Sequence, residues 1–152
     1  MTTAFLRPSE SHTVLSEAPF FADLSDSQRT AVLELGAIED REAGEHFYRI
    51  GEPAKNFYVL ARGIVRLTIG LDQRNASAGD ILHRGEVFGW AALTPNANRR
   101  IATAVCLTPA SVLSLDGKGL LALMDQDHTL GYYLTRQLIL VVTGTFTACA
   151  AG

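Results

Sequence analysis

Residues 85–104, GEVFGWAALTPNANRRIATA, combine features that an ordinary strand or helix does not combine. Gly85 and Gly89 can adopt positive φ angles and allow a close approach of the backbone. The short apolar segment 90–93 then predicts a single helical turn, whose first N–H groups have no helical partner. Because N–H groups in this position bind anions, the stretch predicts an anion-binding turn.

Two arginines follow this turn, after a loop rich in Asn and Pro. Arg99 and Arg100 stand at the start of a strand of small residues, and a guanidinium offers a planar fork of donors that matches phosphate oxygens. Backbone donors and one arginine would together form a phosphate cradle. A hairpin with a solvated arginine pair is the alternative interpretation, and the residues leave both open.

The chain around this stretch alternates short strands with turns. Val65, Leu67 and Ile69 alternate with Arg66 and Thr68, which is the period of a half-buried strand. Further strands are predicted at 46–50, 57–61, 80–84, 101–107 and 110–115, and a hairpin tip is predicted at 70–73. This pattern predicts a mainly β fold, a sandwich or a jelly roll, over residues 37–115.

Helical periodicity lies on both sides of the predicted roll. Residues 1–11 are expected to form a loose arm, followed by a short helix over 12–17. Ser25 and Gln28 fit a capping box at the start of another helix. Helices are also predicted over 116–147, with Asp116 as an N-cap. The 152 residues therefore form one domain, mainly β with helices at both ends.

The last helix is apolar on all sides. Leu130, Leu134, Leu138 and Val141 mark one face, other aliphatic residues cover the opposite side, and Arg136 is the only charge. A helix of this kind needs burial on both sides, which a second copy of the same helix would supply. We therefore expect a homodimer formed through residues 129–147.

Composition and charge argue against several partners. A net charge of −3 does not favour a surface built for nucleic acid. The run LILVV near the end is too short to span a bilayer, so no membrane partner is expected. Cys106 and Cys149 have no metal or redox spacing, and they indicate reduced thiols in a cytoplasmic protein.

No pattern in the chain indicates an enzyme. The sequence contains no GxSxG nucleophile elbow. His12, His46, His83 and His128 are dispersed, whereas a metal enzyme of the cupin type needs clustered ligands. We expect no catalytic residue and no metal ligand, and a cupin-like metal enzyme stays the least favoured hypothesis.

Taken in order, these motifs resemble a known family over residues 13–147. Pro19-Phe20-Phe21, Gly51-Glu52, Gly63-Ile64-Val65, Gly85-Glu86-Val87-Phe88-Gly89 and Arg100-Ile101-Ala102-Thr103-Ala104 are similar to the cyclic-nucleotide-binding domain of the catabolite-activator type. The last two motifs open and close what that family uses as its phosphate-binding cassette. The resemblance implies that the roll is a double-stranded β-helix (jelly roll) and that the ligand is cAMP or cGMP, with no cofactor. It also implies no direct DNA binding by this chain, because no helix-turn-helix domain follows the long helix.

The resemblance also implies a set of ligand-binding residues. Arg100 falls where the family binds the cyclic phosphate, Gly89 where a backbone group contacts the ribose, and Thr145 where some members touch the base. Trp90 replaces the glutamate that commonly binds the ribose, and Ile101 replaces a common Ser or Thr. The full candidate set is Gly89, Trp90, Ala91, Ala92, Arg99, Arg100, Ile101, Ala102 and Thr145.

Three hypotheses follow for the function. The first is a regulatory domain that senses cAMP or cGMP through Arg100 and signals to an unknown downstream protein. The second is a degenerate copy of the fold that acts as a dimerising module or senses another small anion. The third is the metal enzyme. The indole of Trp90 accepts no hydrogen bond, so we expect weak cAMP and cGMP binding, with the ring either filling the ribose space or turned outward onto the roll.

Overall fold

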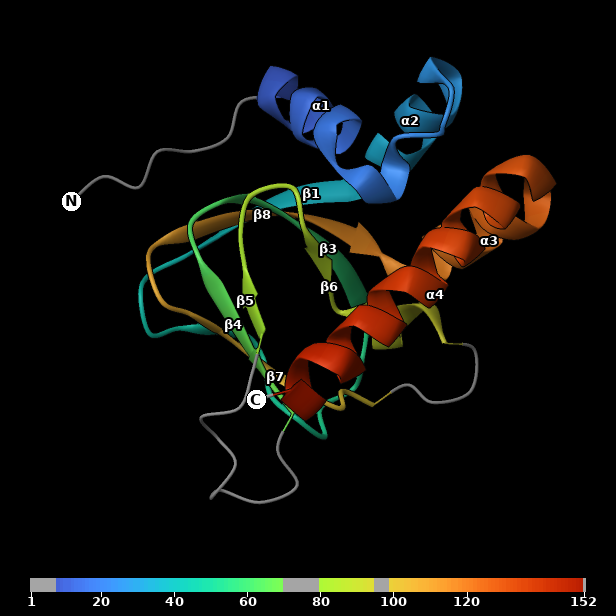
Figure 1. The fold of residues 1–152 in the computed structure, drawn as a ribbon. Coiled ribbons are helices and arrows are strands. Elements are labelled where there is room, and N and C mark those ends of the chain that lie inside the picture. Colours follow the sequence, from blue (N-terminus) through green and yellow to red (C-terminus); the bar gives the residue numbers. More distant parts are fainter. Residues whose placement is uncertain (1–7, 70–79, 95–98, 152) are drawn as a thin grey trace.

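The computed structural model describes residues 8–69, 80–94 and 99–151, with side chains for 10–69, 80–94 and 99–144. Within these residues, eight antiparallel strands form two four-stranded sheets, in the orders β1-β8-β3-β6 and β2-β7-β4-β5. The strands are β1 Gly36–Arg41, β2 His46–Tyr48, β3 Asn56–Arg62, β4 Val65–Thr68, β5 Asp80–Leu82, β6 Val87–Phe88, β7 Thr103–Cys106 and β8 Ala110–Asp116. The two sheets form the roll, and helices lie at both ends of the chain (Figure 1), which confirms the predicted jelly roll.

Strands β3, β6 and β8 of the β1-β8-β3-β6 sheet are buried on both faces, whereas the edge strand β1 is half-buried. Along β3, Phe57 and Val59 belong to the cluster under the helices, whereas Tyr58 and Leu60 belong to the cluster inside the roll. Successive side chains of a strand point to opposite faces, so one strand contributes to both cores. This double burial explains why the segment 57–61 is apolar throughout instead of alternating.

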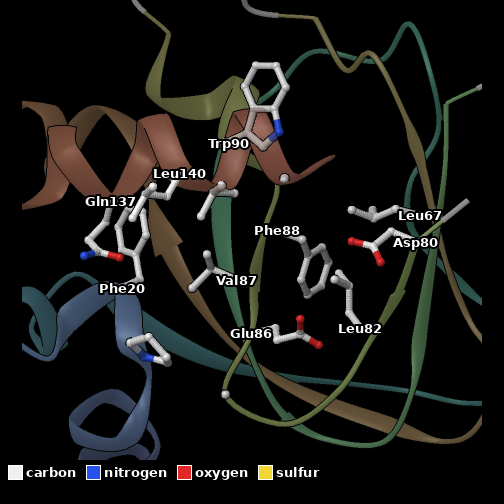
Figure 2. Close-up of a pocket in the computed structure, with 14 residues that line it drawn as sticks. Phe20, Leu67, Asp80, Leu82, Glu86, Val87, Phe88, Trp90, Gln137 and Leu140 are labelled. Carbon is white, nitrogen blue, oxygen red and sulfur yellow. The ribbon is translucent and has the colours of Figure 1, made fainter. Parts of the chain in front are cut away.

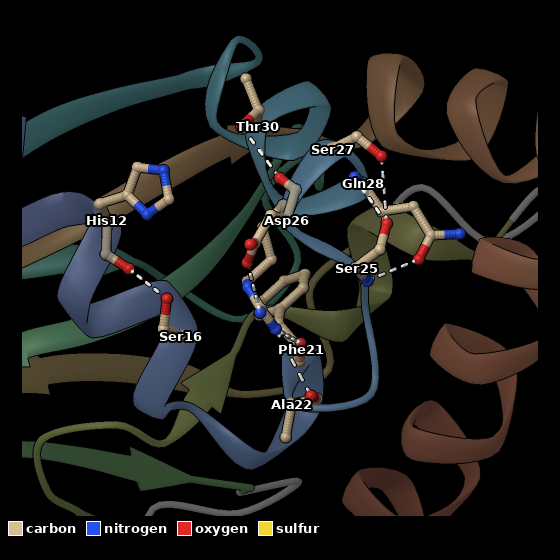
Figure 3. A network of polar contacts seen from close by, with 10 residues as sticks. His12, Ser16, Phe21, Ala22, Ser25, Asp26, Ser27, Gln28 and Thr30 are labelled. Carbon is tan, nitrogen blue, oxygen red and sulfur yellow. Dashed lines mark hydrogen bonds and ion pairs between the residues drawn. The ribbon is translucent and has the colours of Figure 1, made fainter.

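The N-terminal elements pack on the outer side of that sheet. They are α1 Pro8–Glu17, the 3-10 turn η1 Pro19–Phe21 and α2 Asp26–Leu33. The capping box of α2 is confirmed: Gln28 N–H donates to Ser25 Oγ at 3.2 Å, and Ser25 N–H donates to Gln28 Oε1 at 2.8 Å (Figure 3).

The predicted loose arm over 1–11 is wrong for its last four residues. Helix α1 begins at Pro8, because this segment is anchored to the roll by an ion pair between Glu10 and Arg62 and by the buried Ser11. Residues 1–7 of the arm and the hairpin tip predicted at 70–73 lie outside the described residues.

Two helices follow the roll, α3 Gly117–Gln126 and α4 His128–Ala151. Asp116 caps α3 as predicted, accepting a hydrogen bond from Gly119 N–H at 2.9 Å. Helix α4 then runs back along the roll, where it contacts η1 and β5 (Figure 1). Leu130 and Leu134 are fully buried in the chain's own core, so this face of α4 is not available to a second copy.

Candidate functional site

The glycine-flanked turn has the predicted backbone. Gly85 and Gly89 adopt φ angles of 91° and 83°, and the 3-10 turn η3 spans Trp90–Leu93. A β-carbon at Gly89 would lie 2.9 Å from Tyr58 Cδ2, so both the conformation and the space require glycine here. The carbonyl of Gly89 accepts a hydrogen bond from Ala92 N–H at 3.2 Å and faces the side chain of Arg100.

Arg100 is buried, and its fork of donors points at the backbone. Its Nη1 donates to Gly89 O at 2.9 Å and its Nη2 donates to Asn56 O at 2.7 Å, with only 4% of the residue exposed. The guanidinium also lies over the ring of Tyr48, 4.0 Å from the centroid. Among the described residues, its Nε has no hydrogen-bond partner.

Burial changes the acid–base behaviour of this group and of the two rings beside it. Desolvation lowers the pKa of Arg100, while the nearby Tyr48 and Tyr58 act in the opposite direction. Desolvation likewise raises the pKa of Tyr48 and of Tyr58. Arginine remains protonated under all physiological conditions, so the site holds a fixed positive charge against two neutral phenols.

Very little space remains in front of Arg100. The cavity between Arg100, Gly89 and Trp90 measures about 20 Å³, which is roughly the room that one water molecule needs. Ala91, Ile101 and Ala102 complete its wall, together with Tyr48, Leu67 and Ile69. In this conformation the cassette is closed by the chain's own carbonyls and side chains.

The paired arginines have separate environments. Arg99 is exposed, as predicted, and its Nη1 donates to Gly51 O at 3.2 Å. Ala92 is buried and does not line the small cavity, and neither does Arg99. The side chain of Thr145 lies outside the described residues, although its backbone belongs to α4.

The sequence suggested that the Trp90 ring would either fill the ribose space or turn outward onto the roll, and its position in the structure combines the two. The indole is partly buried and packs against the hydrophobic cluster under the helices. It also lines both the small cavity beside Arg100 and a second, much larger cavity, and Leu67 does the same. These two side chains therefore form the partition between the two spaces.

The larger cavity lies between α4, η1 and the roll and was not predicted from the sequence. It measures about 370 Å³. Its walls are mostly apolar (Figure 2), and they are formed by Pro19, Phe20, Leu67, Asp80, Leu82, Gly85, Glu86, Val87, Phe88, Trp90, Gln137, Leu140, Val141 and Gly144. The residues come from distant segments, so only the apolar side of α4 could have indicated the site.

Two carboxylates stand in the walls of this large cavity. Asp80 lies beside Leu67 on the β4–β5 pair, and Glu86 lies at the end of the view opposite Trp90 (Figure 2). Glu86 Oε2 accepts a hydrogen bond from His83 N–H at 2.6 Å, and its side chain is 49% exposed. Among the described residues that line the cavity, none carries a positive charge.

Other candidate chemistry does not converge on this region. Burial raises the pKa of the Cys106 thiol to about 11, so Cys106 is a core residue and not a thiolate at neutral pH. Within the described residues, no three His, Cys, Asp or Glu side chains come together as a metal site would require. None of the helices in that part of the chain has both the length and the hydropathy for a bilayer span.

Solved structures share this architecture. A protein of Geobacter metallireducens GS-15 superposes with a TM-score of 0.74 at 20% identity, covering 93% of this chain and 98% of that one. The sensor domain of the transcriptional regulator DNR from Pseudomonas aeruginosa gives a TM-score of 0.71 at 22% identity, covering 86% and 87%. At these identities the likeness concerns the fold.

Similarity to known sequences identifies the family. The cGMP-dependent protein kinase isozyme 1 of Drosophila melanogaster is 29% identical over 119 residues, which is 76% of this chain and 15% of the kinase. A Rhodopseudomonas palustris protein is 27% identical over 117 residues, and this chain spans only 28% of its length. The family model described as the cyclic nucleotide-binding domain matches residues 39–127, more than half of the chain. The chain therefore belongs to the cyclic nucleotide-binding domain family.

Proposed function

We propose that the chain is a regulatory, ligand-sensing domain that binds cAMP and cGMP only weakly. The observation that carries this proposal is the engaged state of Arg100, whose fork donates to Gly89 O and Asn56 O beside a cavity of about 20 Å³. The family and its regulatory relatives, a cyclic-nucleotide-dependent kinase and the sensor domain of a transcriptional regulator, support a sensing role over a catalytic one.

Two missing hydrogen-bond partners and one set of competing hydrogen bonds weaken the binding of a cyclic nucleotide. Trp90 offers no acceptor to the ribose hydroxyls, and Ile101 offers no hydroxyl to the phosphate. Together they forgo about 2–4.5 kcal/mol, or roughly 30- to 2000-fold in affinity. A phosphate must in addition either draw Arg100 away from its two carbonyls or use the single Nε–H donor that has no partner among the described residues.

Calorimetric titration with cAMP and cGMP tests this proposal directly. Wild type should bind both weakly, and Trp90→Glu combined with Ile101→Ser should strengthen binding, because it restores a ribose acceptor and a phosphate partner. Tight binding by wild type, or no gain in the double variant while its circular dichroism is unchanged, would contradict the proposal.

Arg100 is the cation that we assign to the phosphate. In the double-variant background, Arg100→Ala should weaken any phosphate ligand by about 10- to 150-fold, because one charge-assisted hydrogen bond contributes about 1.5–3 kcal/mol. Arg99→Ala is the matched control, since Arg99 is exposed and does not line the cavity. A larger loss in the Arg99 variant would show that the wrong arginine was chosen.

A second copy of the chain is the partner that we propose for the exposed side of α4. Tyr132 and Ile139 are 59% and 61% exposed, stand two helical turns apart on one face, and flank Arg136, whose guanidinium lies 5.5 Å from the Tyr132 ring centroid. Leu140 is 65% exposed beside them. This exposed apolar face favours the interaction-module hypothesis as a second function of the same domain.

Light scattering at several concentrations tests the dimer. Tyr132→Glu with Ile139→Glu should give a folded monomer, because both side chains are exposed in the single chain. Leu134→Glu, by contrast, tests folding alone, since Leu134 is fully buried. A wild type that stays monomeric at high concentration would contradict the dimer.

A further inference from the structure

We infer that the cavity between α4 and the roll is a binding site for an apolar organic amine. This inference rests on the proposed sensing function, and it names the class of molecule that the larger cavity would take. A cyclic nucleotide is an anion, so the inferred ligand differs in charge from the ligand after which the family is named.

The size and lining of the cavity fit a small organic molecule. Its volume of about 370 Å³ falls within the range of small-molecule sites, which are usually apolar with a few polar groups. Phe20 and Leu140 form the helical side, and Leu82, Val87 and Phe88 form the side of the roll (Figure 2). A compact hydrocarbon would be surrounded by carbon on both sides.

The charges of the lining favour a cation. Asp80 and Glu86 are the two ionised groups in the described walls, and both are negative. Arg84, the arginine nearest to Glu86 in the sequence, is paired with Glu17 at 3.0 Å and donates to Ala61 O. Arg100 does not line this cavity, because Trp90 and Leu67 stand between the two spaces. An anion placed here would be repelled by these carboxylates, and none of the described lining residues is a cation that would compensate.

The aromatic lining adds to this preference. The rings of Phe20, Phe88 and Trp90 all border the cavity. The faces of aromatic rings attract an ammonium group within about 6 Å of the centroid, most strongly when the site is desolvated. An amine can therefore interact with a carboxylate at the rim and with a ring in the interior, while its hydrocarbon part fills the apolar space.

A matched series of adamantane derivatives tests the charge preference. The three compounds carry an aminomethyl, a hydroxymethyl or a carboxylate group on the same hydrocarbon cage. The chain has a single tryptophan, Trp90, which lines the cavity, so its fluorescence reports on occupancy. We expect the amine to bind at least about 10-fold more tightly than the carboxylate, with the alcohol between them.

Two sets of variants locate the site. Asp80→Asn with Glu86→Gln should reduce the difference between amine and carboxylate to about 3-fold or less, because it removes the charges and keeps the shapes. Gly144→Phe should block the cavity, and the fold should tolerate it, since a β-carbon at Gly144 meets nothing within 4 Å. Thr135→Phe is the matched control, because Thr135 is an exposed residue of α4 outside the cavity.

The outcomes of these experiments decide between the two proposals. Amine binding that Gly144→Phe abolishes and Thr135→Phe leaves unchanged supports the inference. Equal or tighter binding of the carboxylate overturns it, and so does the absence of binding by any of the three compounds. Titration of cAMP into the same samples separates the failures, since weak cAMP binding without amine binding overturns the inference alone, whereas tight cAMP binding overturns the proposed function.

Discussion

The two cavities on either side of Trp90 differ in every property that selects a ligand. The one beside Arg100 has a positive charge and about 20 Å³ of room, whereas the one beside α4 has two carboxylates and about 370 Å³. The first is closed by hydrogen bonds from Arg100 to the backbone, and the second is bordered by side chains of distant elements.

This contrast shows that the positive charge of Arg100 and the room for a ligand belong to different cavities. In the described structure the group suited to a phosphate lies where no phosphate fits, and the room for a ligand lies where no lining group is positive. The buried Arg100 also donates hydrogen bonds to the carbonyls of Gly89 and Asn56, so we expect it to contribute to the stability of the roll. A residue that resembles a ligand-binding group can thus have a structural role in the same position.

The largest expected effect concerns the small cavity, which the hydrogen bonds of Arg100 close. Arg100→Ala should lower the free energy of unfolding by about 2–4 kcal/mol, because it removes two charge-assisted hydrogen bonds, one to a buried and one to a part-buried carbonyl. Arg99→Ala should stay within about 0.5 kcal/mol, since Arg99 is exposed. Urea denaturation of both variants measures the difference, and equal losses would show that the contacts of Arg100 do not stabilise the roll.

Removing the partition should join the two spaces. Trp90→Ala deletes a partly buried indole, so we expect a loss of about 1.5–3 kcal/mol in the free energy of unfolding, less than for a fully buried tryptophan. The joined cavity would reach Arg100, and the preference for an amine over a carboxylate should fall, as calorimetry can measure. Trp90→Phe is the control that keeps an aromatic wall, and an unchanged preference in the alanine variant would show that Trp90 does not separate the sites.

The smallest expected effects compare packed and open parts of α4. A β-carbon at Gly131 would lie 2.6 Å from Met124 O, whereas one at Gly144 meets nothing within 4 Å. Gly131→Ala should therefore destabilise the chain by about 1 kcal/mol or more, while Gly144→Ala should stabilise it by about 0.5 kcal/mol through helix propensity. Thermal melts of the two variants measure both effects, and changes in Tm of the same sign would contradict the difference in packing.

Local features were the ones that sequence reasoning predicted well. The capping box at Ser25, the cap at Asp116 and the turn Trp90–Leu93 each depend on residues within four positions of one another, and all three are confirmed. The two-residue strand β6, Val87–Phe88, was not predicted, because so short a segment has no period of its own. The helical start of α1 was also missed, since the ion pair from Glu10 reaches Arg62 on another element.

The sequence by itself determined the succession of short strands, the glycine-dependent turn and the place of Arg100 next to it, because backbone preferences and hydrophobic periodicity act over a few residues. Only the tertiary structure decided where the guanidinium of Arg100 points, since its acceptor on Asn56 is 44 residues away in the chain and approaches only when the sheet has formed. The cavity beside α4 likewise exists only after η1, β4–β6 and α4 have packed together. Its volume and charge depend on how these elements meet, and no short stretch of sequence records that arrangement.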